Sequence, residues 1–120
     1  MGYYVLMTRV EKGWGYELWI VNKKEYCGKL LFFHKDKKCS YHYHKIKDET
    51  FYLQSGSMKV LWADDDRSLD LANVTWLEPG QSFYIPPYRR HMMVAHKDCE
   101  LFEFSTQHFE EDSYRIVKGD

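Results

Sequence analysis

Turn-forming residues recur about every eight to twelve positions along this chain, and this spacing constrains the fold more than any other feature. Between the turns lie short runs rich in Val, Ile, Tyr, Phe and Trp, which favour strands. The runs that predict strands are YELWIV, KLLFFH, TFYLQ, MKVLWA, SFYIP and LFEFS. No run repeats apolar residues at helical spacing, and only residues 67–72 are expected to form a helical turn. Short strands joined by polar turns predict an all-β sandwich or barrel.

The length of 120 residues predicts a single domain spanning residues 1–120. A domain of this size buries about two thirds of the surface that its unfolded chain exposes. Apolar residues make up 44% of the chain and aromatic residues 18%, which indicates a globular rather than a disordered protein.

Charge, hydropathy and cysteine usage exclude several classes of protein. The formal net charge is −1 and no basic stripe is present, so we expect no nucleic-acid partner. No apolar run approaches the ~18 residues of a membrane helix, and no secretion signal is recognised at the start, so we expect no membrane partner. The chain has an odd number of cysteines, and they are far apart in the sequence: Cys27, Cys39 and Cys99. This pattern predicts reduced thiols and a cytoplasmic protein.

Residues 40–56, SYHYHKIKDETFYLQSG, hold two histidines and a glutamate at close spacing. Side chains alternate between the faces of a strand, so His42 and His44 point the same way. If that face lines a barrel interior, the two imidazoles are placed to share one metal ion. Glu49 follows a short turn, and its same-face neighbours are a phenylalanine and a leucine. A carboxylate on an apolar inward face is costly unless it is paired or bound to a metal.

A third histidine lies in a second segment, GQSFYIPPYRRHMMVA, at residues 80–95. Gly80 predicts a turn, Pro86–Pro87 ends a short strand, and His91 begins another strand. The same-face neighbours of His91 are a methionine and an alanine, so this imidazole also belongs to a small apolar face.

The spacing His-x-His-x4-Glu-x6-Gly, followed by Gly-x5-Pro-x4-His, resembles the two signature motifs of the cupins. This resemblance implies a double-stranded β-helix, which is a small jelly-roll barrel. It also implies that the metal ligands are His42, His44, Glu49 and His91. Tyr88 stands where the pattern usually has glycine, and Ala95 stands where it usually has asparagine. Neither is a ligand position.

The two ends of the chain are similar to the cupin domain of type II mannose-6-phosphate isomerases. EKGWGYE, residues 11–17, resembles the Arg-Pro-Trp-Gly-x-Tyr opening of that group, with Gly13 in place of proline. LFEFSTQHFEEDSYRI, residues 101–116, resembles its closing strand and tail. The matching positions there are Glu103, Glu111–Asp112–Ser113 and Arg115.

The implied ligand set predicts one bound divalent transition metal. Three imidazoles and one carboxylate leave open positions in a five- or six-coordinate site, and an open position is typical of catalytic rather than structural centres. These nitrogen and oxygen donors admit Mn, Zn, Fe, Ni or Co, and the order of affinities does not choose among them.

Two further functions are assigned to particular side chains. In LFEFS, Glu103 shares a face with Leu101 and Ser105, and the pattern alone leaves open whether that face or the phenylalanine face is inside. If Glu103 faces inward, as the resemblance implies, it is the candidate general base. Arg115 and Arg89 are the candidate binding residues for an anionic group of the substrate.

These observations lead to a metal-dependent small cupin acting on a sugar or sugar phosphate. The expected activity is aldose–ketose isomerisation through a metal-stabilised enediolate, with Glu103 carrying the proton. One alternative is a metal-dependent dioxygenase, which an apolar rather than a polar pocket would favour. Another is a non-catalytic barrel that binds a sugar or small ligand.

Oligomeric state is predicted from the edges that a small β-barrel leaves uncovered. A symmetric dimer is the commonest way to cover such edges, so we expect a homodimer. The aromatic stretch from Trp14 to Ile20 is the predicted contact.

Overall fold

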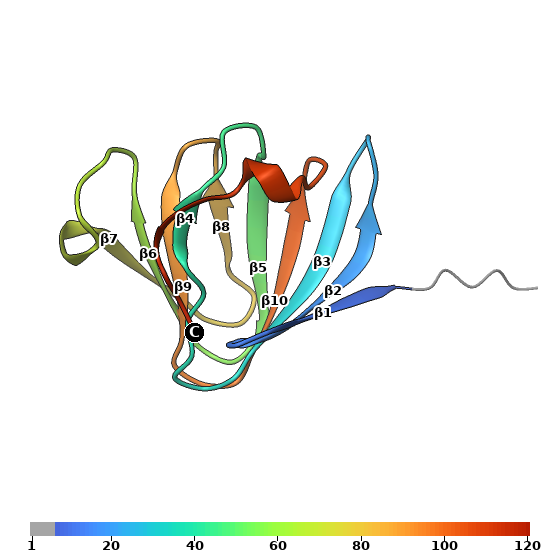
Figure 1. The fold of residues 1–120 in the computed structure, drawn as a ribbon. Coiled ribbons are helices and arrows are strands. Elements are labelled where there is room, and N and C mark those ends of the chain that lie inside the picture. Colours follow the sequence, from blue (N-terminus) through green and yellow to red (C-terminus); the bar gives the residue numbers. More distant parts are fainter. Residues whose placement is uncertain (1–6) are drawn as a thin grey trace, which may run out of the picture.

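The computed structural model describes residues 7–120, which form two antiparallel sheets packed face to face (Figure 1). One sheet has six strands in the order β1-β2-β3-β10-β5-β8, and the other has five in the order β11-β4-β9-β6-β7. The strands are β1 (Thr8–Lys12), β2 (Gly15–Asn22), β3 (Cys27–Phe33), β4 (Tyr41–Tyr43), β5 (Glu49–Ser55), β6 (Met58–Ala63), β7 (Asn73–Leu77), β8 (Ser82–Ile85), β9 (Arg90–Ala95), β10 (Cys99–Ser105) and β11 (Tyr114–Val117). Two single 3₁₀ turns, η1 (Leu69–Leu71) and η2 (Glu110–Asp112), complete the fold.

This arrangement confirms the predicted all-β jelly roll. Each of the six runs predicted as strands lies on a strand, and η1 falls within the segment expected to form a helical turn. Strand β1 was not predicted, because its sequence TRVEK is polar and mostly exposed at the sheet edge. Strand β7 was also not predicted. No helix in residues 7–120 is long and apolar enough to cross a membrane.

The strand alternation expected from the sequence sets the inner face of the six-stranded sheet. In β3 every second residue from Cys27 to Phe33 is buried, and in β5 the buried residues are Glu49, Phe51 and Leu53. The inward residues of β5 and β10 pair as Leu53 with Leu101, Phe51 with Glu103, and Glu49 with Ser105. The interior therefore changes from apolar at one end of these strands to polar at the other.

The apolar end of the interior is filled by a single core cluster. Its N-terminal member, Trp14, is 6% exposed and stacks on Phe33 with ring centroids 4.1 Å apart. Trp14 is therefore buried within its own chain and is not available for the dimer contact predicted for residues 14–20. Ile20 at the other end of that stretch is 43% exposed.

Two glycines of the motif segments give a matched test of the turns. Gly56 and Gly80 both have positive φ, 97° and 91°. A Cβ on Gly56 would lie 2.7 Å from Cys99 Sγ and would also clash with the Asp98 carbonyl, whereas one on Gly80 would have no neighbour within 4 Å. We expect Gly80→Ala to cost about 1 to 2 kcal/mol from backbone strain, and Gly56→Ala about 3 kcal/mol or more. Urea unfolding of both variants measures the difference, and equal losses would contradict it.

Candidate metal centre

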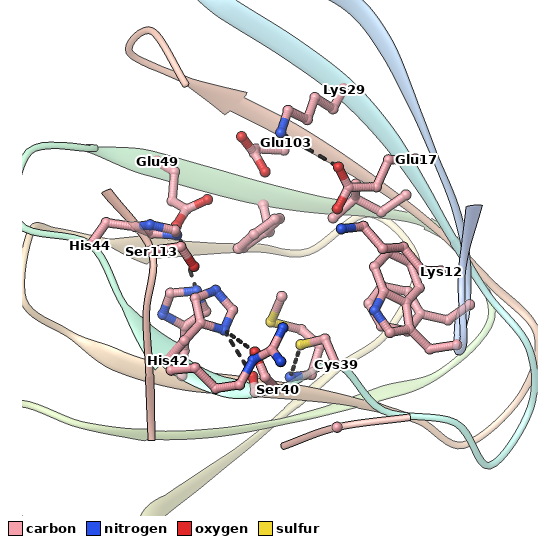
Figure 2. Close-up of a pocket in the computed structure, with 18 of the residues that line it drawn as sticks. Lys12, Glu17, Lys29, Cys39, Ser40, His42, His44, Glu49, Glu103 and Ser113 are labelled. Atoms are coloured by element: carbon pink, nitrogen blue, oxygen red, sulfur yellow. Dashed lines mark hydrogen bonds and ion pairs between the residues drawn. The ribbon is translucent and has the colours of Figure 1, made fainter. Parts of the chain in front are cut away.

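Three histidines converge at the polar end of the interior (Figure 2). His42 lies on β4 and pairs directly with His91 on β9, and His44 follows the end of β4. One ring nitrogen from each of the three lies within 4.8 Å of the others. The strand pairing therefore brings the second motif to the first, as the resemblance to the cupin motifs implied.

Hydrogen bonds fix the orientation of all three rings. The Nδ1 atoms of His42, His44 and His91 each lie 2.9 Å from a backbone carbonyl oxygen, those of Ser40, Asp112 and Arg89 respectively. A carbonyl can only accept a hydrogen bond, so each Nδ1 carries the proton and donates it. Each Nε2 is then left with a free lone pair, which is the form of histidine that binds a metal.

The electrostatic environment keeps these rings neutral. Burial lowers the pKa of His42 to about 3 and the pKa of His44 to about 4, and it lowers the pKa of His91 well below its ordinary value. A neutral imidazole is required of a metal ligand, so the three rings meet this requirement without losing a proton near neutral pH.

Glu49 completes the set from the first position of β5 and is 1% exposed. Its Oε2 atom lies 3.3 Å from His44 Nε2 and 3.5 Å from His91 Nε2. Neither nitrogen carries a proton in the tautomers above, so they cannot donate to this oxygen. Within residues 7–120, Glu49 Oε2 and His91 Nε2 are buried without a hydrogen-bond partner.

Orphaned buried polar atoms are rare in folded proteins and call for an explanation. Donor atoms about 2.1 Å from one metal ion lie about 3 Å apart in an octahedral arrangement. The separations from Glu49 Oε2 to His44 Nε2 and His91 Nε2 are close to this value. The four residues therefore fit one divalent cation, which would satisfy the unpaired oxygen and nitrogen together.

The structure places Glu103 inside, which decides the alternative that the sequence left open. Glu103 is 4% exposed, whereas Phe104 on the other face of β10 is 56% exposed. Glu103 Oε2 forms an ion pair with Lys47 Nζ, and the two atoms are 2.5 Å apart. The same ammonium lies 3.8 Å from Glu49 Oε1, so Lys47 connects Glu103 to the candidate ligand.

The two buried carboxyls are shifted in opposite directions. Burial raises the pKa of Glu49 to about 8, against the opposing effect of the Lys47 charge. Burial would also raise the pKa of Glu103, but the ammonium groups of Lys47 and Lys29 outweigh it and hold this pKa down at about 2. Lys47 itself is stabilised as a cation, since Glu103 and Glu49 raise its pKa to about 12 despite burial. Glu103 is therefore ionised at neutral pH.

A cavity of about 450 Å³ opens from this group, and polar side chains form much of its wall. His42, His44 and Glu49 lie at one side of it, and Lys12, Glu17 and Lys29 lie at the other (Figure 2). The remaining charged or polar lining residues are Ser40, Lys47, Glu103, His108, Glu110, Ser113, Arg115, Lys118 and Asp120. Of these, Arg115 was predicted as an anion-binding residue.

Arg89, the other predicted anion-binding residue, does not line this cavity. Its guanidinium forms a two-pronged ion pair with Asp64, at 2.8 and 3.0 Å, and packs 4.4 Å from the centre of the Trp62 ring. Neither Asp64 nor Trp62 lines the cavity, so this guanidinium is engaged outside it, and adjacency to His91 in the sequence was misleading for Arg89.

Tyr88 is one of the two departures from the cupin pattern, and the structure shows how its position is accommodated. Its φ is +72°, so it adopts the left-handed conformation for which the usual glycine is suited. Its backbone N–H donates to the His44 carbonyl at 2.6 Å, which ties the turn before His91 to the first motif. The turn is thus kept with tyrosine in place of glycine.

Asp112 anchors the loop that carries His44, and the sequence reasoning did not assign it this role. The carboxylate of Asp112 accepts hydrogen bonds of 2.9 to 3.2 Å from the backbone N–H groups of Lys45, Ile46 and Lys47. Its backbone carbonyl accepts the Nδ1–H of His44. One residue of the C-terminal turn therefore holds both the loop and the ring.

Replacing Asp112 is expected to loosen this centre. Asp112→Ala leaves three buried or half-buried N–H groups without their acceptor, so we expect a loss of about 2 kcal/mol in the free energy of unfolding. Misplacement of His44 should weaken Mn²⁺ binding by about 10- to 100-fold. Urea unfolding and a Mn²⁺ titration measure these effects, with the exposed neighbour replaced in Glu111→Ala as the control. Wild-type affinity in a folded Asp112→Ala protein would contradict this role.

Comparisons with known proteins give a fold but no family assignment from sequence. No family model matches the chain, and a search of curated proteins finds no significant match. Among solved structures, the capsular polysaccharide assembling protein CapF from Staphylococcus aureus matches 96% of this chain with a TM-score of 0.82 and 12% identity. An oxalate decarboxylase variant from Bacillus subtilis matches 97% with a TM-score of 0.78 and 17% identity.

KdgF from Halomonas sp. matches 80% of this chain and 81% of its own, with a TM-score of 0.67 and 16% identity. The chain spans only about a third of the CapF and oxalate decarboxylase chains, 33% and 34% respectively. Another matching oxalate decarboxylase structure from Bacillus subtilis is described as containing Mn(II) centres. These likenesses show the cupin fold that the two motifs implied.

Proposed function

We propose that this protein is a metal-dependent cupin-fold enzyme that isomerises a small, oxygen-rich substrate, a sugar or sugar phosphate. The observation that carries the proposal is the convergence of three neutral histidines and an unpaired buried carboxylate oxygen at one wall of a polar cavity. The mannose-6-phosphate isomerase likeness of the chain ends supports the reaction class. The Mn(II) centres of a structural neighbour support Mn²⁺ as the first metal to test.

A divalent metal held by His42, His44, Glu49 and His91 would supply Lewis-acid polarisation of neighbouring substrate oxygens. The three Nδ1–H bonds to backbone carbonyls hold the rings in place, which reduces the reorganisation needed on binding. The Lys47 ammonium lies 3.8 Å from Glu49 Oε1, and Glu49 Oε2 is the oxygen that lies against the histidines.

Glu103 is the proposed proton acceptor. It is ionised because Lys47 and Lys29 stabilise its charge, so it is ready to take a proton from a substrate carbon. The same ion pairs reduce its basicity. An anionic or strongly polar substrate group that draws the Lys47 ammonium away would raise the basicity of Glu103 when the substrate is bound. Arg115 at the cavity wall is the proposed partner of an anionic group.

The polar lining favours this activity over the dioxygenase alternative. An oxidisable apolar substrate would need an apolar pocket, whereas lysine, glutamate, histidine and serine side chains form much of this cavity's wall. Such groups can donate to and accept from several sugar hydroxyls.

The test combines metal content with turnover. Protein purified from metal-replete medium should contain about one equivalent of a divalent transition metal. It should then interconvert an aldose and ketose pair from a panel of sugars and sugar phosphates, with solvent deuterium entering the product by NMR. Oxygen consumption with an iron-loaded protein would favour the dioxygenase instead. A metal-loaded protein that binds sugars without turnover would leave the non-catalytic alternative.

We also retain a cytoplasmic homodimer as a proposal. Since Trp14 is buried, the contact would use the outer face near Ile20, where Tyr26 and Phe104 are also half exposed. Light scattering at working concentration tests this, and a monodisperse monomer would refute it.

A further inference from the structure

Lys29 is a buried cation on the cavity wall, and the carboxylates nearest to it are those of Glu17 and Glu103. It lies on the inward face of β3 among Cys27, Leu31 and Phe33, and it is 2% exposed. Its position pairs with Glu103 on the neighbouring strand β10. The alternation of β3 places this lysine on a core-facing position, which is the signal in the sequence that marks it as unusual.

The Lys29 ammonium has few close contacts. Its nearest carboxylate oxygen is Glu17 Oε1 at 3.6 Å, which is beyond hydrogen-bond length, and Trp19 presents its ring at 4.4 Å. Glu17 Oε1 already accepts a hydrogen bond of 2.8 Å from Trp19 Nε1. Within residues 7–120, the partners recorded for this ammonium are the Glu17 carboxylate, the Trp19 ring and the charge of Glu103, whose pKa it helps to lower. Its three donors therefore have room for a further acceptor from the cavity. Lysine is rarely buried, so an ammonium held at this position on a cavity wall is suited to bind an anion there.

The net charge of the buried groups indicates which ligand would suit Lys29. The buried or nearly buried charged groups at the cavity are Lys29, Lys47, Glu17, Glu49 and Glu103. Together they carry one net negative charge when all are ionised. A divalent cation at the histidines would leave one net positive charge, and one singly charged anion would then neutralise the interior.

We propose that Lys29 binds a carboxylate of the substrate, on the side of the cavity away from the histidines. This narrows the sugar or sugar phosphate proposed above to a sugar acid or a related hydroxy acid. This inference rests on the proposed function for the metal but not on the isomerase chemistry. Lys29 would donate charge-assisted hydrogen bonds to the carboxylate while the rest of the molecule extends toward His42 and Glu49. A phosphate dianion shares this anionic chemistry but would leave the interior negative, so the carboxylate fits better.

Two variants test the inference in opposite directions. Lys29→Met removes the ammonium with little change in shape and should weaken carboxylate binding by about 10- to 100-fold. Glu17→Gln keeps an acceptor for Trp19 Nε1 but removes a competing negative charge, so it should tighten carboxylate binding. Both variants should bind Mn²⁺ with wild-type affinity, because neither residue touches the four candidate ligands.

The probes are gluconate, glycolate, sorbitol and sorbitol 6-phosphate, titrated calorimetrically into Mn²⁺-loaded wild-type and variant proteins. We expect an acid to bind better than sorbitol, and only acid binding to depend on Lys29. Equal binding of an acid by wild type and Lys29→Met, or failure of wild type to bind either acid, would overturn the inference. Binding of sorbitol 6-phosphate that depends on Lys29, without such binding of an acid, would overturn the carboxylate assignment. Absence of Mn²⁺ binding in the wild type would instead refute the proposed function, and acid binding to the metal-free protein would still report on Lys29.

Discussion

His44→Ala protein is expected to lose its metal while keeping its fold. Removing one of four donors should weaken Mn²⁺ binding by more than about 100-fold, because changes to residues that merely orient metal ligands already cost 10- to 100-fold. The fold should survive, since the side chain gives up one hydrogen bond to the Asp112 carbonyl, worth about 1 kcal/mol. Elemental analysis and Mn²⁺ titration measure the binding, and circular dichroism measures the fold.

The matched control for this experiment is His96→Ala. His96 is exposed and lies outside the histidine cluster, where its ring meets the edge of Trp76. It should leave the metal content unchanged. If His44→Ala retained a full equivalent of metal at wild-type affinity, the centre assigned here would be wrong. If both variants lost metal equally, the loss would reflect general damage instead of a missing ligand.

Glu103→Gln is expected to abolish most turnover without affecting the metal. A positioned general base typically contributes about 10²- to 10⁴-fold, and glutamine cannot accept the proton. The amide has the shape of the carboxylate and can still accept hydrogen bonds from Ser105 and Lys47, so the cavity should keep its form. The measurements are the rate of deuterium incorporation with the substrate identified by the panel, and metal content by elemental analysis.

Glu100→Gln is the control on the same strand. Glu100 lies on the opposite face of β10 and accepts a hydrogen bond from Ser55 at the far end of the strand. It should retain wild-type turnover. Unchanged turnover in Glu103→Gln would remove Glu103 from the chemistry and direct attention to Lys47. Loss of metal in Glu103→Gln would show that Glu103 acts through Glu49 and not on the substrate.

The parts of the fold that could be predicted are those determined by local sequence. Aromatic and β-branched residues flanked by turn residues predicted six strands, since such side chains pack on a pleated surface. Strand β1 could not be predicted this way. Its residues are polar, and it is a strand because it pairs with β2 from Thr8–Trp19 to Lys12–Gly15. Pairing of this kind is visible only once the sheet exists.

In the candidate site too, the residues that could be predicted are those that belong to local sequence motifs. His42, His44 and Glu49 have a local spacing that already implies one face and one turn, and His91 follows from a second local motif. Lys47 contacts Glu103, and Asp112 contacts the loop that carries His44, each across more than fifty residues of sequence, which no local pattern contains. Arg89 was misplaced for the same reason, because its partner Asp64 comes from another part of the chain.

The hydrogen bond from His44 to Asp112 also has a consequence for folding. The two residues are 68 positions apart, and the turn that contains Asp112 leads directly into β11, which pairs with β4. The ring of His44 can therefore reach its final orientation only after this C-terminal segment has docked. Folds dominated by such long-range pairings typically form in milliseconds to seconds. In refolding, competence to capture metal should accordingly appear late, after most of the strand structure has formed.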